Sequence, residues 1–121
     1  MSTRCQTFIK ANGHPVATIY RHCDGYPTGM GRDLCEMIRK ETTPHELVVK
    51  ILTAWNFDAE LEEIDAKHGD TEYEYTVEFP NPAYAGGKPT LTIKSLHTNE
   101  EIKGDDWGKL MMELDDFEKE N

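Results

Sequence analysis

Cysteine is scarce in this chain, and the few cysteines present are widely spaced. Cys5, Cys23 and Cys35 are odd in number and form no Cys-x-x-Cys pair. Secreted disulfide scaffolds usually contain an even number of cysteines, and structural zinc sites need clustered ligands, so the pattern favours neither. We therefore expect reduced thiols and a cytoplasmic protein.

Long apolar runs are also missing. No stretch approaches the ~18 apolar residues that a membrane-spanning helix requires, and the amino-terminal segment lacks the apolar run of ~7–15 residues found in secretory signals. Hydrophobic residues make up 37% of the chain and charged residues 30%. This composition predicts a single domain over residues 1–121, with a lean core, a well-solvated surface and no membrane segment.

The residue types of common catalytic motifs are few or badly placed. Ser2 and Ser95 are the only serines, and neither lies in a Gly-x-Ser-x-Gly segment. Cys23 follows His22, but adjacent side chains of a strand point to opposite faces, so this histidine is badly placed to activate the thiol. We therefore expect no catalytic residue and no cofactor, and the sequence favours a non-enzymatic function.

Basic residues are outnumbered in this chain. It contains 23 acidic and 13 basic residues, which gives a formal net charge of -10. Nucleic acids and anionic membranes are bound through Lys and Arg, so neither is expected as a direct ligand, whereas a basic protein surface is. The alternative is that the acidic runs are ordinary solvated faces. The acidic interface candidates are Asp58, Glu60, Glu62, Glu63, Glu113, Asp115 and Asp116, and a further acidic run contains Glu100, Glu101, Asp105 and Asp106.

Several segments alternate as strands do. Gln6–Lys10 and Val16–Cys23 flank Asn12-Gly13, a pair that favours the positive φ values of a tight hairpin turn. Thr71–Phe79 alternates apolar and polar residues, which predicts a strand with one buried face, and Thr90–Leu96 is a further strand. Residues 58–67 fit either a helix or a strand that leads into a hairpin at His68-Gly69-Asp70.

Three segments repeat apolar residues at helical spacing. A helix is expected over Arg32–Lys40, and a second begins at Thr43-Pro44-His45-Glu46, where Thr43 can cap it. The last follows Asp105-Asp106, and its stripe packs on the sheet or, alternatively, forms an oligomer interface. These elements predict an α+β fold: a mostly antiparallel sheet of four to five strands with about three helices packed on one face. The stripe residues are Trp107, Leu110, Met111, Leu114 and Phe117.

Two segments with His-x-Asp spacing are the candidates for a ligand site. If the two segments met in space, their nitrogen and oxygen ligands would suit Mn²⁺, Fe²⁺ or Zn²⁺. The alternative is that each is a turn, in which the aspartate bonds its own backbone. The sequence leaves open whether they meet. The ligand-binding candidates are Tyr20, Arg21, His22, Asp24, Tyr26, His68 and Asp70.

A glycine-rich segment, Gly25 to Gly31, precedes the first expected helix. Exposed N–H groups at a helix start bind anions, and Arg21 and Arg32 lie close in sequence, so a nucleotide phosphate could bind here. The Gly-Lys-Ser/Thr and Gly-x-Gly-x-x-Gly patterns of nucleotide sites are absent. A plain loop that redirects the chain is the alternative.

The order of these motifs resembles a family of small phage and prophage proteins of unassigned activity. The resemblance is carried by residues 1–5, by Tyr-Arg-His-x-Asp-Gly-Tyr-Pro at residues 20–27, and by His-Gly-Asp-x-Glu-Tyr-x-Tyr at residues 68–75. It implies a phage or mobile-element context, and a hairpin closed by His68–Asp70. By analogy with other small acidic phage proteins, we expect an anti-CRISPR-like inhibitor that binds a basic surface of a host defence complex in the host cytoplasm. The alternative is a nucleotide-binding or metal-dependent enzyme that uses both His-x-Asp segments.

Overall fold

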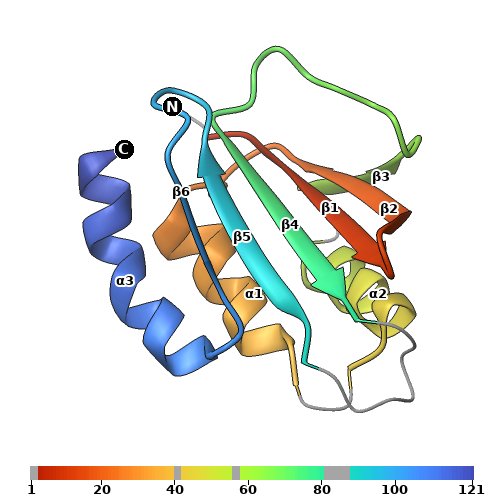
Figure 1. The fold of residues 1–121 in the computed structure, drawn as a ribbon. Helices are drawn as coiled ribbons and strands as arrows, with labels where there is room; N and C mark the ends of the chain where they lie inside the picture. The colour runs from red at the N-terminus through yellow and green to blue at the C-terminus, as the bar shows by residue number, and fades with distance from the viewer. Residues whose placement is uncertain (1–2, 40–41, 56–57, 81–87) are drawn as a thin grey trace.

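One sheet with helices on one side forms the framework of the computed structural model, which describes residues 3–39, 42–55, 58–80 and 88–121 (Figure 1). The expected α+β class is confirmed, with three α-helices in this described part. The elements are β1 (Cys5–Ala11), β2 (His14–Arg21), a π-helix (Pro27–Gly31), α1 (Arg32–Met37), α2 (Pro44–Ala54), β3 (Ala59–Glu62), β4 (Tyr73–Phe79), β5 (Thr90–Ser95), β6 (Glu101–Gly104) and α3 (Trp107–Glu120).

The sheet has more strands than expected, and it is mixed. Six strands lie in the order β3-β2-β1-β4-β5-β6. The central pair β1 and β4 is parallel, with Cys5 opposite Tyr73 and Ala11 opposite Phe79, while the other pairs are antiparallel. The expected four to five mostly antiparallel strands are therefore corrected. The sequence missed β6, because four residues with one apolar side chain give too short a pattern.

The β1–β2 hairpin forms as its turn residues predict. Asn12 and Gly13 have φ values of 52° and 78°, the left-handed conformation that a two-residue hairpin turn needs. The register shifts between Ile9 and Lys10, so that Pro15 lies opposite Lys10 near the turn. Pro15 donates no hydrogen bond, and its place beside this irregularity avoids an interruption of the regular ladder.

The core lies between one face of the sheet and the helices. The alternation of β4 is confirmed, since Tyr73, Tyr75, Val77 and Phe79 are all buried. The start of α2 is confirmed as well: the Thr43 hydroxyl accepts a hydrogen bond from the Glu46 N–H at 3.1 Å. The stripe of α3 packs on its own domain, with Leu110, Leu114 and Phe117 buried and Trp107 and Met111 half-buried.

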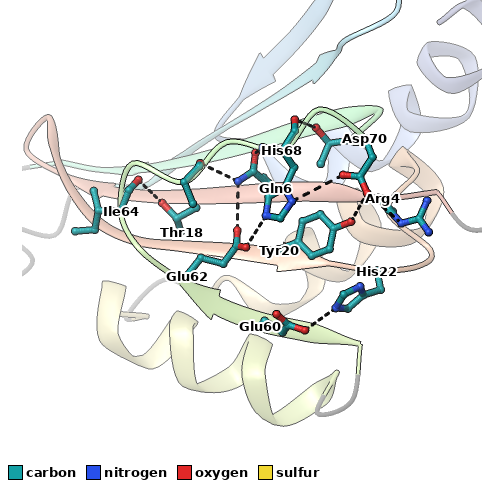
Figure 2. A network of polar contacts seen from close by, with 12 residues as sticks. Arg4, Gln6, Thr18, Tyr20, His22, Glu60, Glu62, Ile64, His68 and Asp70 are labelled. Atoms are coloured by element: carbon teal, nitrogen blue, oxygen red, sulfur yellow. Dashed lines mark hydrogen bonds and ion pairs between the residues drawn. The ribbon is translucent and has the colours of Figure 1, made fainter.

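The connection between β3 and β4 differs most from expectation. The ambiguous segment 58–67 contains the strand β3, but β3 pairs with β2, so the expected hairpin at His68–Asp70 is wrong. Residues 63–72 instead cross the face of the sheet opposite the helices, above β2 and β1 (Figure 2). A hydrogen bond from the Thr18 hydroxyl to the Ile64 carbonyl, at 2.7 Å, helps to hold this connection on the sheet.

The glycine-rich segment is helical, and the helix that follows is shorter than expected. Pro27–Gly31 forms the π-helix, which continues directly into α1, and α1 ends at Met37. Lys40, the expected end of that helix, lies outside the described residues. Among the helices of the described residues, none has the length and hydropathy of a membrane span.

Candidate functional site

Tyr20 is the centre of a cluster of aromatic and acidic side chains on the open face of the sheet (Figure 2). Its ring stacks on that of His68, with the centroids 3.9 Å apart and the planes at 23°. The ring of His22 meets it edge-on, with the centroids 4.8 Å apart. Tyr20 and His22 share a face because they alternate along β2, and His68 reaches them from the β3–β4 connection. The two His-x-Asp segments thus meet, through their histidines, at one tyrosine.

A hydrogen bond from Tyr20 ties Asp70 to this cluster. The Tyr20 hydroxyl donates to Asp70 Oδ2 at 2.9 Å, and Arg4 Nε lies 3.4 Å from the same oxygen. Burial, with the hydrogen bond and the negative charge of Asp70, raises the pKa of Tyr20 to about 12. The phenol therefore stays protonated at neutral pH, where it acts as a hydrogen-bond donor.

Gln6 and Glu62 hold the connection in place. The fully buried Gln6 donates from Nε2 to the Ala66 carbonyl at 2.9 Å and to Glu62 Oε1 at 3.3 Å. The other oxygen of Glu62 lies 2.5 Å from His68 Nε2. The Glu62 side chain is only 15% exposed, so this carboxylate serves the internal network.

His22 has a separate carboxylate partner. Its Nε2 lies 2.8 Å from Glu60 Oε1, and both side chains are exposed. Asp24, the other aspartate of the spacing, leaves the shared face because β2 ends at Arg21 and Asp24 has a φ of 56°. Within the described ranges, no three His, Cys, Asp or Glu side chains are grouped so that they could hold a metal ion. The four-ligand arrangement considered from the sequence therefore does not form there.

Arg21 lies on the opposite, helix-facing side of the sheet. It is only 5% exposed, its Nη1 lies 3.2 Å from Asp33 Oδ2, and its guanidinium carbon lies 4.0 Å above the Trp55 ring. Asp24 Oδ2 is 4.0 Å from Nη2, and the Tyr26 hydroxyl donates to Asp24 Oδ1 at 3.2 Å. Arg21, Asp24 and Tyr26 thus stabilise the end of β2, and the arginine is not free to bind a phosphate.

The backbone of the glycine-rich segment is engaged by α3. Glu118 Oε1 accepts hydrogen bonds from the N–H and the hydroxyl of Thr28, each at 2.8 Å. Gly31 is buried between β5 and α3, where an added Cβ would lie 3.1 Å from Ile93 and 3.2 Å from Leu114. The segment therefore fixes α3 against the sheet, and a carboxylate occupies the N–H group that an anion would need.

The cysteine thiols are not activated. Burial raises the pKa of Cys5 to about 12 and that of Cys35 to about 11. The pKa of Cys23 is raised by burial and by the nearby Asp58 carboxylate. A thiol is nucleophilic as its thiolate, so these environments oppose cysteine chemistry at neutral pH.

The acidic candidates fall into two groups. Glu60 and Glu62 face histidines, while Asp58 and Glu63 are exposed close to them in the chain. On α3, Glu113 and Asp116 are exposed, and Asp115 pairs with Lys119 at 3.1 Å.

A groove between β6 and α3 was not foreseen from the sequence. Two hollows, of about 250 Å³ and 360 Å³, lie along the seam between the two elements. Their apolar lining residues are Ile102, which is half-buried, and Leu110 and Phe117, which are buried; their basic residues are Lys103 and Lys109. We call this seam the β6–α3 groove. Several acidic residues within the range 100–106 marked this region in the sequence, but a groove could not be inferred because β6 was not predicted. Its carboxylates are Glu100, Glu101, Asp105, Asp106, Glu113 and Glu120.

Comparisons with known proteins add no relative to this description. No protein-family model, no curated protein and no solved structure matches the chain.

Proposed function

We propose that this chain is a non-enzymatic binding domain that attaches through exposed carboxylates to a basic surface of another protein. The observation that carries the proposal is one face of α3, where Glu113, Asp116 and Glu120 are exposed at helical spacing. Among the described residues, none of the three forms an ion pair with Lys or Arg. Their charge is therefore available to a partner.

The spacing of these carboxylates resembles that of a nucleic-acid backbone. A helix rises ~1.5 Å per residue, so the three side chains follow one another about every 5 Å along the axis. One strand of DNA carries a phosphate about every 3.4 Å. The face therefore has roughly two-thirds of the linear charge density of a DNA strand, which suits a surface that binds nucleic acid.

The remaining polar groups support binding over catalysis. Tyr20 is a protonated donor, the described cysteines have raised pKa values, and each histidine of the Tyr20 cluster contacts a carboxylate. The resemblance to small phage proteins makes a host defence nuclease, such as a CRISPR effector, the partner class to test first. Such a protein would act in the host cytoplasm.

Competition for a CRISPR nuclease would test the proposal. The nuclease–guide complex is bound to a labelled DNA duplex, and the chain is titrated at 50 mM and 500 mM salt. We expect displacement of the duplex at low salt and a loss of displacement at high salt, because exposed charges are screened within ~8–10 Å at ordinary ionic strength. The Glu113→Lys/Asp116→Lys variant should displace the duplex at least about tenfold less well.

Two controls separate this reading from its alternatives. Glu36→Lys/Asp65→Lys changes the net charge equally at exposed sites on α1 and on the β3–β4 connection, outside the acidic face of α3, and it should compete as the wild type does. His22→Ala/His68→Ala should also compete normally. Displacement that persists at high salt, that responds equally to both charge-reversed variants, or that requires the two histidines would contradict the proposal. If several CRISPR nucleases are tested and none of them releases the duplex when the chain is added, the choice of partner class is contradicted.

A further inference from the structure

The outer edge of β6 is free to pair with another strand. The Ser95 N–H donates to the Glu100 carbonyl at 2.9 Å, which fixes the hydrogen-bonding phase of the β5–β6 pair. Since antiparallel strands alternate, Ile102 directs its N–H and C=O toward β5, while Glu101 and Lys103 direct theirs away. Both residues are exposed, and β6 is the last strand of the sheet (Figure 1). Within the described residues, no partner covers these backbone groups.

The β6–α3 groove lies directly beside this free edge. Ile102 and Gly104 point to the helix side of the sheet, because Ile93, opposite Ile102, is buried there. An added Cβ on Gly104 would lie 3.9 Å from Leu110, so the groove reaches the backbone of the strand. A strand placed along β6 would therefore direct alternate side chains toward the groove, where Ile102 is half-buried.

The charge of the groove selects among such strands. Six carboxylates line it, against two lysines, Lys103 and Lys109. None of these groups takes part in an ion pair among the described residues. An incoming segment with several basic residues would be attracted to the groove, and an acidic one would be repelled.

The opposite edge of the sheet is a weaker candidate. The edge strand β3 has the exposed Leu61, but the Ala59 N–H already donates to the Trp55 carbonyl at 2.9 Å. Glu60 and Glu62 contact His22 and His68. A partner at this edge would therefore meet fewer free backbone groups and carboxylates that are already engaged.

We propose that an extended, lysine- or arginine-rich segment of the partner protein pairs with β6 as an additional strand. Its apolar side chains face the groove and cover the half-buried Ile102. Its basic side chains, at the alternate positions, face the other side of the sheet, as Glu101 does, and are attracted by the net negative charge of the groove. The outward N–H and C=O groups of Glu101 and Lys103 supply the backbone hydrogen bonds, which is the usual way in which peptides add to a sheet edge. This inference rests on the proposed function and specifies how the partner binds.

Amide hydrogen exchange gives a residue-specific test. The probe is a seven-residue peptide of alternating Lys and Val, acetylated and amidated at its ends, and the control probe replaces Lys with Glu. At saturating Lys-Val peptide, the amides of Glu101 and Lys103 should exchange at least about tenfold more slowly. The amide of Ile102, already bonded to β5, should change little. The Glu-Val peptide should leave all of these rates unchanged.

The Lys103→Pro variant tests the same edge by mutation. Proline removes the outward N–H at this position together with the Lys103 charge, and proline is tolerated on an edge strand whose N–H faces solvent. We expect Lys103→Pro to weaken peptide binding at least about tenfold, while Lys109→Ala, which removes a charge without touching the strand, does not weaken it. If Lys103→Pro misfolds, the exchange measurement on the wild-type protein still decides.

The outcomes separate this inference from the proposed function. Peptide binding without protection of Glu101 and Lys103, or no binding of the Lys-Val peptide at millimolar concentration, overturns the strand pairing. If the wild-type chain and the Lys103→Pro variant displace the duplex from the nuclease equally well, the partner binds the acidic face of α3 without adding a strand. If the chain fails to compete but the peptide protects β6, the nuclease assignment fails and the strand pairing stands.

Discussion

Gln6 supports a sharp prediction about how the β3–β4 connection is held. Gln6→Leu keeps nearly the same volume, so it removes hydrogen bonds without opening a large cavity. The bonds lost are those to the Ala66 carbonyl, at 2.9 Å, and to Glu62 Oε1, at 3.3 Å, together with a long bond that Gln6 Oε1 accepts from the His68 N–H, at 3.4 Å. A neutral bond contributes about 0.5–1.5 kcal/mol and a bond to a charged group about 1.5–3 kcal/mol, so we expect a loss of about 2–4 kcal/mol in the free energy of unfolding.

Urea unfolding followed by circular dichroism measures this loss. The matched control is Thr76→Val, which also replaces a polar side chain on the open face, but one without a side-chain hydrogen bond among the described residues. We expect its free energy of unfolding to stay within about 0.5 kcal/mol of the wild type. If Gln6→Leu also stays within that range, the connection is held by something other than Gln6, and the network inferred here is wrong.

Two further predictions concern buried contacts. Tyr20→Phe should lower stability by about 1 kcal/mol at pH 7 through loss of the bond to Asp70. Because the pKa of Tyr20 is raised from 10.0 to about 12, the stabilisation that Tyr20 contributes is present below pH ~10 and fades as the pH rises toward 12. Urea unfolding of the wild type and of Tyr20→Phe at several pH values would show this. A difference in the free energy of unfolding that grows as the pH rises from 10 to 12 would contradict it. Gly25→Ala should destabilise by about 1–3 kcal/mol, because its Cβ would lie 2.9 Å from both Cys5 Cβ and the Thr3 carbonyl. Gly69→Ala, with open space around it, should be nearly neutral in thermal unfolding; equal effects of the two would refute the steric argument.

Local signals in the sequence identified the elements whose pattern is long enough. Seven alternating residues define β4, Asn12-Gly13 defines the first hairpin, and Thr43 defines the start of α2. β3 and β6 have four residues each, which is too few for a periodic pattern. The parallel pairing of β1 with β4 joins residues almost 70 positions apart, and no local signal specifies such a partner.

The candidate site, like the fold, could be predicted from the sequence only in part. Alternation along β2 predicts that Tyr20 and His22 share a face, but the stacking of His68 on Tyr20 depends on a connection that crosses two strands. The candidates Arg21, Asp24 and Tyr26 lie outside the Tyr20 cluster. Arg21 alternates with Ala17 and Ile19, which are buried against the helices, so its position on the inner face could have been predicted from the sequence.

The central place of β1 also constrains the order in which the chain folds. Its pairing with β2 closes a loop of two residues, so this hairpin can form within microseconds of leaving the ribosome. Its other edge must wait for β4, which begins at Tyr73, and sequence separations of this size slow folding. Until then, one side of the strand that carries Ile9 lacks its partner. A chain that ends before β4 would therefore expose a long central edge, and we expect it to aggregate instead of forming a stable fragment.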